Sequence, residues 1–451
     1  MDTKKLRQKI LDLAIRGKLV PQDPNDEPAS VLLERIRAEK EQLIKESKIK
    51  RSKKSVATDK SHYENVPFEI PESWVWTSIG ELFEHNTGKA LNASNRDGKM
   101  MDYITTSNLY WDRFDLSVVK QMLFTEEELW RCTAKKGDLL ICEGGDIGRA
   151  AIWNYDYDIR IQNHIHRLRG YKGINHRFYY FVFLLYKLSN RIGGKGVAIQ
   201  GLSSGDLHKL EVPLPPEYEQ IRLVKTIEKW FKFVDLLEQE QENLHTLVQS
   251  TKSKILDLAI SGKLVPQDPN DEPAIELLKR INPVFQPCDN SHYENLPPGW
   301  AVCRLEDILD YEQPQAYIVN STDYSDEYET PVLTAGKSFI IGYTNETNGI
   351  CDRLPVIIFD DFTTDSKLVD FHFKVKSSAM KILRTKGEIN IDYIAYYMSI
   401  TRLIGDTHKR YWISEYSKLL IPIPPYQEQL RIVETIETIF DKIHKITAEL
   451  S

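Results

Sequence analysis

The sequence predicts an α+β protein: two mixed α/β domains separated by two long antiparallel coiled-coil helical spacers, in a circular arrangement with pseudo-two-fold symmetry. Three observations predict it. Residues 9–36 and 254–281 are identical at 24 of 28 positions. Residues 212–231 and 421–440 match at 11 of 20 positions. The segments between these repeats are poorly alike, so a scaffold is duplicated around two domains that have diverged.

The offsets of the two repeats predict the circular arrangement. The first repeat has an offset of 245 and the second an offset of 209, so Met1 maps to position 246 and Ser451 to position 242 of the central segment. The two chain ends together therefore form a second copy of that segment, split by the termini. We expect the termini to meet in space.

Five segments follow in order along the chain. They are the N-terminal half of the split helical region with a basic linker, the first domain, the central helical region, the second domain and the C-terminal half of the split region: 1–60, 61–212, 213–281, 282–421 and 422–451.

The helical segments share one apolar pattern. After a Pro-rich start, apolar residues of the central segment recur three or four positions apart, which is typical of a helix with a coiled-coil seam: Ile221, Val224, Ile227, Phe231, Val234 and Leu237. We expect one helix from Glu217 to Ala259. Gly17 and Gly262 follow the two helical copies and are suited to end a helix.

The two domains combine strands with one aromatic helix each. Short runs rich in apolar and β-branched residues predict strands at 138–142, 150–153, 355–359 and 371–375. Helix-like stretches are expected at 178–188 and 391–398.

Composition narrows the class of protein. Hydrophobic residues make up 41% and charged residues 28%, as is ordinary for a soluble globular chain. No apolar run reaches the roughly 20 residues of a membrane span, and no secretory leader is expected. Five scattered cysteines without a C-x-x-C pair favour a reducing cytoplasm over disulfides or zinc. The net charge of −7 is unlike that of a generic polyanion binder, so nucleic-acid contacts would come from local patches.

Motifs that suggest catalysis or metal binding each have a simpler interpretation. The glycine-rich run 143–148 resembles a phosphate cradle but fits a hairpin turn better. Residues 282–285 resemble an amino-methyltransferase motif with one proline missing, and a loop after a helix is the alternative. His164 and His166 share a strand face without a third ligand. The acidic residues in 360–367 fit a solvated turn better than a nuclease cluster. No catalytic residue and no metal site is predicted.

Two polar loops and a third polar cluster are better suited to contact DNA, with ordinary surface loops as the alternative. Lysine and arginine pair with guanine, glutamine pairs with adenine, and hydroxyl groups fix phosphates. The candidates in the first domain are Asn92, Asn95, Arg96, Lys99, Thr105, Thr106, Asn108, Lys195, Gln200, Ser203 and Ser204. Those in the second domain are Lys337, His408, Lys409, Arg410 and Tyr411.

The layout resembles the specificity (S) subunit of type I restriction–modification systems. Each variable domain closes on a [VI]-P-[LI]-P-P-x-x-E-Q-x-R segment, at 212–222 and at 421–431. The ILDLAI-x-GKLVPQ repeat and residues 136–140, followed by 145–148, also fit this family. The resemblance covers essentially the whole chain, and the departures lie inside the variable domains.

The resemblance implies a non-catalytic reader of duplex DNA. The two α/β domains would be target-recognition domains, each binding one half of a bipartite site, and the helices would set the gap between the halves. Two methyltransferase (M) subunits would dock on the helices, and restriction (R) subunits would join them. S-adenosylmethionine and ATP would bind those partners, and this chain would hold no cofactor. The candidate partner-binding residues on the helices are Ile221, Val224, Phe231, Leu430, Val433 and Phe440.

Two other interpretations stay open from the sequence. A coiled-coil scaffold that does not bind DNA would show no sequence preference. A self-contained methyltransferase or nuclease would be active as the purified chain.

Overall fold

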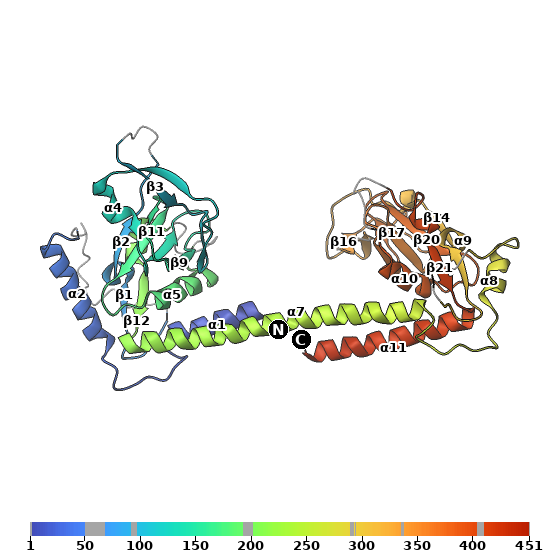
Figure 1. The fold of residues 1–451 in the computed structure, drawn as a ribbon, viewed down its shortest axis with the longest axis horizontal. Helices are drawn as coiled ribbons and strands as arrows, with labels where there is room; N and C mark the ends of the chain where they lie inside the picture. The colour runs from blue at the N-terminus through green and yellow to red at the C-terminus, as the bar shows by residue number, and fades with distance from the viewer. Residues whose placement is uncertain are drawn as a thin grey trace. The chain divides into compact units, whose positions relative to one another are not determined.

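A computed structural model describes residues 2–49, 68–91, 97–192, 202–288, 293, 295–334, 338–403 and 410–450. The chain divides into two compact units, Met1–Glu240 and Gln241–Ser451, each with helices and a mixed domain of its own (Figure 1). Unit 1 and unit 2 below denote these two parts. The α+β class predicted from the sequence is confirmed in both.

Unit 1 has helices on either side of a β-rich domain. Its helices are α1 (Thr3–Ile15), α2 (Ala29–Lys45), α3 (Ile79–Leu82), α4 (Glu126–Cys132), α5 (His176–Leu188), α6 (Ser204–Lys209) and the first part of α7 (Glu217–Ile260). Its strands are β1 (Val75–Ser78), β2 (Phe83–Thr87), β3 (Lys99–Ile104), β4 (Leu109–Tyr110), β5 (Arg113–Phe114), β6 (Lys120–Phe124), β7 (Thr133–Ala134), β8 (Leu139–Cys142), β9 (Ala150–Ile152), β10 (Ile159–Ile161), β11 (Ile165–Gly170) and β12 (Glu211–Leu214).

Two four-stranded sheets form the centre of unit 1, in the orders β6-β3-β10-β7 and β2-β11-β8-β9. A separate antiparallel pair, β1 with β12, joins the start of the domain to its end and sets Val75 opposite Leu214. This pair holds together the two chain segments through which the domain joins the helices.

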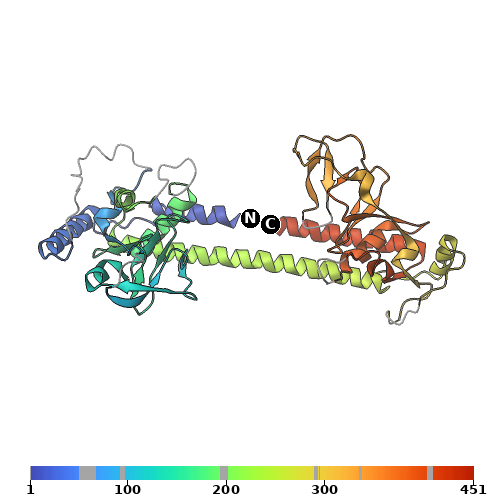
Figure 2. The same ribbon diagram turned by 90° about the horizontal axis from the view of Figure 1, so that it is seen from above.

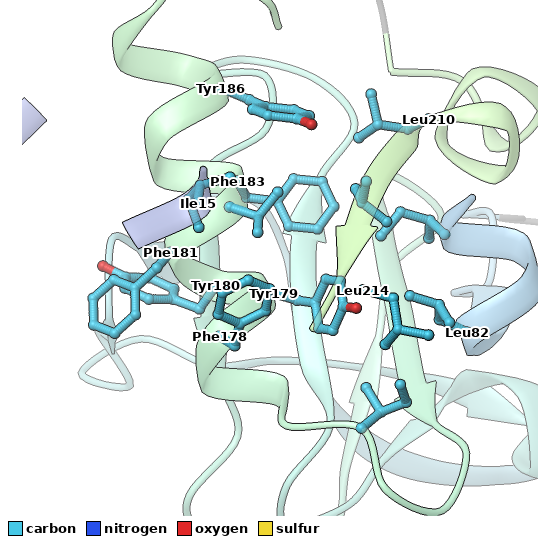
Figure 3. Packing of buried hydrophobic residues seen from close by; sticks show 14 of the residues in the cluster. Ile15, Leu82, Phe178, Tyr179, Tyr180, Phe181, Phe183, Tyr186, Leu210 and Leu214 are labelled. Carbon is cyan, nitrogen blue, oxygen red and sulfur yellow. The ribbon is translucent and has the colours of Figure 1, made fainter. Parts of the chain in front are cut away.

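The core of unit 1 lies between α5 and this strand pair. The sequence HRFYYFVFLLYKL of α5 is apolar around most of its circumference, and eight of its residues are buried. Figure 3 shows Phe178, Phe181 and Tyr186 of α5 packed with Ile15 of α1 and Leu214 of β12. A helix that is apolar on nearly every face is stable only when it is enclosed in this way.

Unit 2 repeats this plan with fewer strands. Its helices are the rest of α7, α8 (Ala274–Ile281), α9 (Leu305–Ile308), η2 (Pro314–Tyr317), α10 (Ile391–Ile400), η3 (Tyr416–Lys418) and α11 (Tyr426–Leu450). Its strands are β13 (Ala301–Arg304), β14 (Leu309–Glu312), β15 (Thr330–Leu333), β16 (Ile340–Thr344), β17 (Val356–Asp360), β18 (Ser366–Val369), β19 (Lys374–Val375), β20 (Met380–Thr385) and β21 (Leu420–Ile423).

The described residues of unit 2 form three sheets, in the orders β14-β20-β17-β18, β16-β15-β19 and β13-β21. The pair β13–β21 sets Ala301 opposite Ile423 and corresponds to the β1–β12 pair of unit 1. The strand expected at 371–375 shortens to Lys374–Val375, because Phe373 pairs through its backbone with Cys351 in an isolated bridge.

The long helix predicted after the first domain is present as α7, with 44 residues. In unit 1, α1 lies beside α7 (Figure 2). Arg7 of α1 contacts Asp235 and Glu238 of α7. In unit 2, Lys252 of α7 lies 5.1 Å from the ring centroid of Phe440 of α11. Each terminal helix thus packs on the part of α7 that belongs to its own unit.

Candidate functional site

A buried glutamate ties α7 to the domain of unit 1. The indole Nε1 of Trp74 donates a hydrogen bond of 2.9 Å to one carboxylate oxygen of Glu219, and the Gln22 amide donates one of 2.6 Å to the other. Burial raises the pKa of Glu219 above its ordinary value. One turn further on, Arg222 forms a bidentate ion pair with both carboxylate oxygens of Asp26. We call Gln22, Asp26, Trp74, Glu219 and Arg222 the hub of unit 1.

Unit 2 contains the same hub. Trp300 and Gln267 donate hydrogen bonds of 3.0 Å each to the carboxylate of Glu428, whose pKa burial raises in the same way. Arg431 pairs with both carboxylate oxygens of Asp271. The five residues occupy the positions that correspond by sequence to those of unit 1. The same hub is therefore present in both units.

The glutamine of the E-Q-x-R motif fixes the neighbouring helix of each domain. Gln220 accepts a hydrogen bond of 2.8 Å from the backbone N–H of Asn175, which caps α5, and donates one of 3.1 Å to the carbonyl of Pro215. Gln429 accepts a hydrogen bond of 2.9 Å from the backbone N–H of Asn390, the cap of α10. Both glutamine side chains are buried and satisfied, as buried amides must be for the fold to be stable.

A glycine ends each helical repeat against a proline of its own domain. Gly17 has φ +68°, and a Cβ added there would lie 2.4 Å from Pro71 Cγ. Gly262 has φ +69°, and its Cβ would lie 2.3 Å from Pro297 Cγ. Both the left-handed conformation and the close approach therefore require glycine. The prediction that these glycines end the helices is confirmed, and their contact with the domains is a second reason for their presence.

The sequence located the P-P-x-x-E-Q-x-R motif but not the role of its side chains. Glu219, Gln220 and Arg222 act as structural links between helix and domain. Gln22, which bonds to Glu219, and Asp26, which pairs with Arg222, lie in the other repeat, nearly two hundred residues away in the chain. The signal that could have paired them is that both partners recur unchanged in the second copy, as Gln267 and Asp271.

Half of the residues predicted to contact DNA lie outside the described residues: Asn92, Asn95, Arg96, Lys195, Gln200, Lys337, His408 and Lys409. Of the others in unit 1, Lys99 at the start of β3 and Ser203 and Ser204 at the start of α6 are exposed, and Thr106 is half-buried. The Ser203 hydroxyl caps α6 by accepting a hydrogen bond of 3.2 Å from the backbone N–H of Asp206. These side chains remain candidates for DNA contact.

Thr105 and Asn108 are buried, which contradicts the prediction that they face DNA. The Asn108 side chain accepts a hydrogen bond of 2.9 Å from the backbone N–H of Thr105 and donates to the carbonyls of Asp115 and Val118 at 2.9 and 2.8 Å. These bonds use the polar groups of Asn108 to shape the loop after β3. A polar run in sequence does not distinguish such internal use from surface contact.

In unit 2, Arg410 is exposed and lies 5.9 Å from the ring of Phe362. Its neighbour Tyr411 is only 4% exposed, so the prediction that this ring contacts DNA is wrong for the structure described here. The Tyr411 backbone N–H donates a hydrogen bond of 2.9 Å to the carbonyl of Asp361. Tyr411 therefore anchors the chain next to Arg410 instead of facing outward.

A buried ion pair supports that anchor. Lys381 Nζ lies 3.3 Å from one carboxylate oxygen of Asp361 and donates a hydrogen bond of 3.0 Å to Gln313. The other oxygen of Asp361 accepts a hydrogen bond of 2.8 Å from the backbone N–H of Trp412. The turn after β17 is confirmed, but Asp361 is buried instead of solvated, because Lys381 neutralises its charge.

Two histidines form a hydrogen-bonded chain in unit 1. His85 Nε2 and His166 Nδ1 lie 3.0 Å apart on neighbouring strands, and His166 Nε2 lies 2.7 Å from the carbonyl of Leu202. Since a carbonyl only accepts, His166 Nε2 carries the proton and His85 Nε2 donates to His166 Nδ1. Burial lowers the pKa of His85 to about 3 and also lowers the pKa of His166. Neutral histidines thus hold Leu202, next to Ser203.

The six candidate partner-binding residues divide into two groups. Ile221 and Leu430, which are equivalent in the two repeats, are exposed by 51% and 38%. Val433 is buried in the core of unit 2, and Phe440 packs against that core. Val224 and Phe231 pack against the core of unit 1. Val224, Phe231 and Phe440 are only partly buried, so a role in docking stays a prediction for them, whereas Val433 is enclosed in its own unit.

The simpler interpretations of the remaining motifs hold. Residues 143–148 connect the antiparallel strands β8 and β9 as a hairpin. Residues 282–285 form the loop after α8. His164 is exposed, 3.6 Å from Glu143, whereas His166 is buried against His85. Within the described residues, no group of histidine, cysteine and acidic side chains is arranged to hold a metal ion.

The described part of the chain also contains no helix that is both long and apolar enough to cross a membrane.

Comparison with known proteins gives one family. The model of the type I restriction modification DNA specificity domain matches the chain twice, over residues 71–246 and 297–451. The two matches cover the domain of each unit and the helix that follows it.

Curated relatives carry the same description. A type I restriction enzyme EcoR124I/EcoR124II specificity subunit from Escherichia coli is 48% identical over 36% of this chain, which corresponds to 43% of its own length. The EcoAI specificity subunit, also from Escherichia coli, is 25% identical over 98% of this chain and 90% of its own length. The first match is thus local and spans under half of that relative, whereas the second spans nearly all of both chains.

One solved structure is similar in fold. It comes from work on complex assembly and conformational transition of the type I R-M system, with a TM-score of 0.55 and 16% identity over 85% of this chain and 94% of that chain. At this identity the likeness concerns the fold alone.

Proposed function

This chain belongs to the family of type I restriction–modification DNA specificity subunits, and from that premise we propose that its two units each read one half of a bipartite site in duplex DNA. The observation that carries the proposal is the paired organisation: two family matches, each of which contains the tryptophan and glutamate of the same hub. A duplicated hub that carries two diverged domains suits a protein that presents two different DNA-binding surfaces. A scaffold that does not bind DNA gains no support from the comparisons.

The exposed polar side chains are the candidates for reading. In unit 1 these are Lys99, Ser203 and Ser204, and in unit 2 Arg410. Arginine can bind guanine O6 and N7 in the major groove, and serine hydroxyls can bind base edges or phosphates. The buried anchors, Leu202 on His166 and Tyr411 on Asp361, would hold the backbone next to these side chains in one place. Preorganisation of this kind lowers the entropic cost of binding.

The helices would set the distance between the two half-sites. We propose that α1 and α11 form the split partner of α7, as antiparallel coiled-coil spacers with pseudo-two-fold symmetry. The antiparallel contact of Arg7 with Asp235 in unit 1 and that of Phe440 with Lys252 in unit 2 support this. Forty-four residues of helix span about 66 Å at 1.5 Å per residue. A rigid element of this length fixes an unspecified gap without contacting its bases.

The exposed apolar residues of α7 in unit 1 would receive a methyltransferase subunit. Trp230 and Phe233 are each 47% exposed, and their rings pack edge to face at 5.9 Å. Leu236 and Ile221 are exposed on the same helix. Large aromatic side chains that remain accessible on a helix are typical of protein interfaces. These residues extend the surface predicted from the exposed candidate Ile221.

The catalytic steps would be carried out by the partner subunits. We propose that this chain is not an enzyme, holds no cofactor and assembles with methyltransferase and restriction subunits that bind S-adenosylmethionine and ATP. A methyltransferase partner would flip the target base out of the stack, because the reacting atom is otherwise out of reach.

A map of modified bases in host DNA, with and without the gene, tests the proposal. We expect one bipartite methylated motif with a fixed gap to disappear when the gene is removed and to return when it is restored. A methylated motif that survives deletion would contradict the proposal, provided that the partner methyltransferase is expressed.

A further inference from the structure

Unit 1 has a basic groove between α1 and the end of α5. Its volume is about 330 Å³, and its lining includes Lys5, Lys9, Arg16, Phe68 and Arg191. The three cations of α1 are four and seven residues apart, so they lie on one face of the helix.

The groove carries net positive charge. Asp12, which also lines it, pairs with Arg16 through a hydrogen bond of 2.7 Å and offsets that charge. Lys9 and Arg191 have no carboxylate partner among the described residues. Lys5 lies 3.2 Å from Asp2, but its side chain is 85% exposed, and such pairs contribute little. Two cations are therefore available to an anion, and a third is loosely held.

One aromatic ring positions both guanidinium groups. Phe68 lies 4.9 Å from the Arg16 guanidinium and 5.2 Å from that of Arg191. Phe68 is itself buried and packs edge to face on Trp76 at 4.9 Å. Cation–π contacts on a fixed ring restrict the two arginines, which lowers the entropy lost when an anion binds.

Unit 2 lacks several of the residues that build the groove. Arg16 is one of only four departures within the 28-residue repeat, and its equivalent is Ser261. The position of Lys5 is occupied by Ser250. The stretch from SHYEN to the hub tryptophan is four residues shorter in unit 2 and has no counterpart of Phe68. Two of the three cations on this helix face, Lys5 and Arg16, are thus serine in the copy, whereas Lys9 is retained as Lys254.

We propose that this groove binds backbone phosphates of the duplex beside the half-site read by unit 1. The inference rests on the proposed function and adds a second, sequence-independent contact to it. From Lys5 to Arg16 the cations extend over about 16 Å of helix, at 1.5 Å per residue. One DNA strand presents a phosphate about every 3.4 Å of the duplex axis, so a row of this length meets several. Arg191 stands two residues before the predicted reading loop that begins at Gly193.

The test is a salt titration of duplex binding by the complex of this chain with its methyltransferase partner. The variants are Lys9→Gln, which removes one exposed charge without touching the fold, Lys9→Gln with Arg191→Gln, and Arg16→Ser, which installs the residue of unit 2. Lys254→Gln is the matched control, because Lys254 is the equivalent of Lys9 in the identical repeat of unit 2.

For each phosphate contact removed, the slope of log affinity against log salt should become shallower by about 0.9. Affinity for target and non-target duplexes should fall by the same factor, the methylated motif should stay the same, and the control should not change. An unchanged slope and affinity in the double variant, with the motif intact, would overturn the groove assignment. A changed first half-site would also overturn it, since the groove would then read bases. If the native complex shows no bipartite preference at all, the proposed function has failed instead.

Discussion

Trp74 donates its indole N–H to the carboxylate of Glu219 at 2.9 Å, and this bond links the residue just before β1 to the first turn of α7. The bond from Trp300 to Glu428, at 3.0 Å, repeats it in unit 2. Each glutamate also accepts from a glutamine in the loop between two helices, Gln22 between α1 and α2 and Gln267 between α7 and α8. The same hub therefore attaches each domain to its helix, although the sequences of the two domains have diverged.

Removing the glutamate should loosen one unit and spare the other. Glu219→Ala leaves the Trp74 indole without an acceptor and leaves the Gln22 amide with only the carbonyl of Gly17, and a buried unsatisfied group costs about 1–3 kcal/mol. We expect hydrogen exchange of β1 and β12 to accelerate in Glu219→Ala, with no change in β13 and β21. Glu428→Ala should produce the reverse pattern. Glu217→Ala is the control, because Glu217 forms only an exposed ion pair at 3.4 Å. Equal effects of all three variants would contradict the role of the two glutamates in attaching each domain to its helix.

The glycine at the end of each helical repeat should not tolerate a side chain. Gly17→Ala places a Cβ 2.4 Å from Pro71 at φ +68°, and we expect it to destabilise unit 1 by more than about 1 kcal/mol. Gly144→Ala is the control, since nothing lies within 4 Å of its added Cβ and its φ is not positive. The thermal midpoints of the two variants measure the difference. Similar midpoints for both would show that the contact with Pro71 is not needed.

Unit 1 should lose stability in mild acid. The pKa of His85 is lowered to about 3 by burial and by its neighbours His166, His208 and Arg167. The unfolded chain therefore binds a proton near pH 6.5 that the folded unit binds only near pH 3. Stability is full above about pH 6.5 and falls as the pH drops through this window, by at most about 1.4 kcal/mol per pH unit for each such histidine.

Hydrogen exchange of β2 and β11 at pH 7.5 and 5.5 measures this loss. His85→Gln keeps a donor for His166 and removes the titrating group, so its unit 1 should depend less on pH. The exposed His164→Gln serves as the control and should behave like the native chain. A native unit 1 that is equally stable at both pH values would contradict the buried neutral histidines.

Two neighbouring aromatic residues of α7 should have separate roles. Phe233→Asp changes an exposed ring, so we expect reduced co-purification of the methyltransferase subunit with an unchanged thermal midpoint. Phe231→Ala removes a ring that packs against the core of unit 1 and lies 5.1 Å from the Arg7 guanidinium. That variant should lower the midpoint. If Phe233→Asp retained its partner fully, the docking surface would lie elsewhere.

The length of α7 should set the gap between half-sites. An insertion of four residues near Gln241 adds about 6 Å of helix, and both half-sites should persist in the methylated motif with a longer gap. A methylated motif with the original gap would contradict the role of α7 as a spacer.

Repeats and periodicity predicted the parts of the fold that depend on local sequence. The helix α7, the hairpin at 143–148 and the helix-ending glycines follow from residues close together in the chain. The hub could not be assembled in this way, because Gln22 meets Glu219 only after the domain between them has folded. The burial of Tyr411 depends on the same kind of distant packing, since its backbone N–H bonds to Asp361. Asn108 bonds within its own loop, to Thr105, Asp115 and Val118. The candidate DNA-contact residues, which were chosen as polar residues in loops, therefore include both surface groups and groups that form internal hydrogen bonds.

The same limit applies to the helix seam. The three- and four-residue spacing of apolar residues predicted one apolar stripe along α7. On a single turn of that helix, however, Leu223 is buried and Ile221 is exposed. Which side of a helix faces its own unit depends on where the domain packs, and no local pattern specifies this.

The most direct test of separate reading by the two units is a methylated-base map of cells that carry single-unit variants. Arg410→Ala should relax the half-site read by unit 2 and leave the other half unchanged. Ser203→Ala with Lys99→Ala should relax the half read by unit 1 alone. If either variant altered both halves together, the assignment of one half-site to each unit would be contradicted.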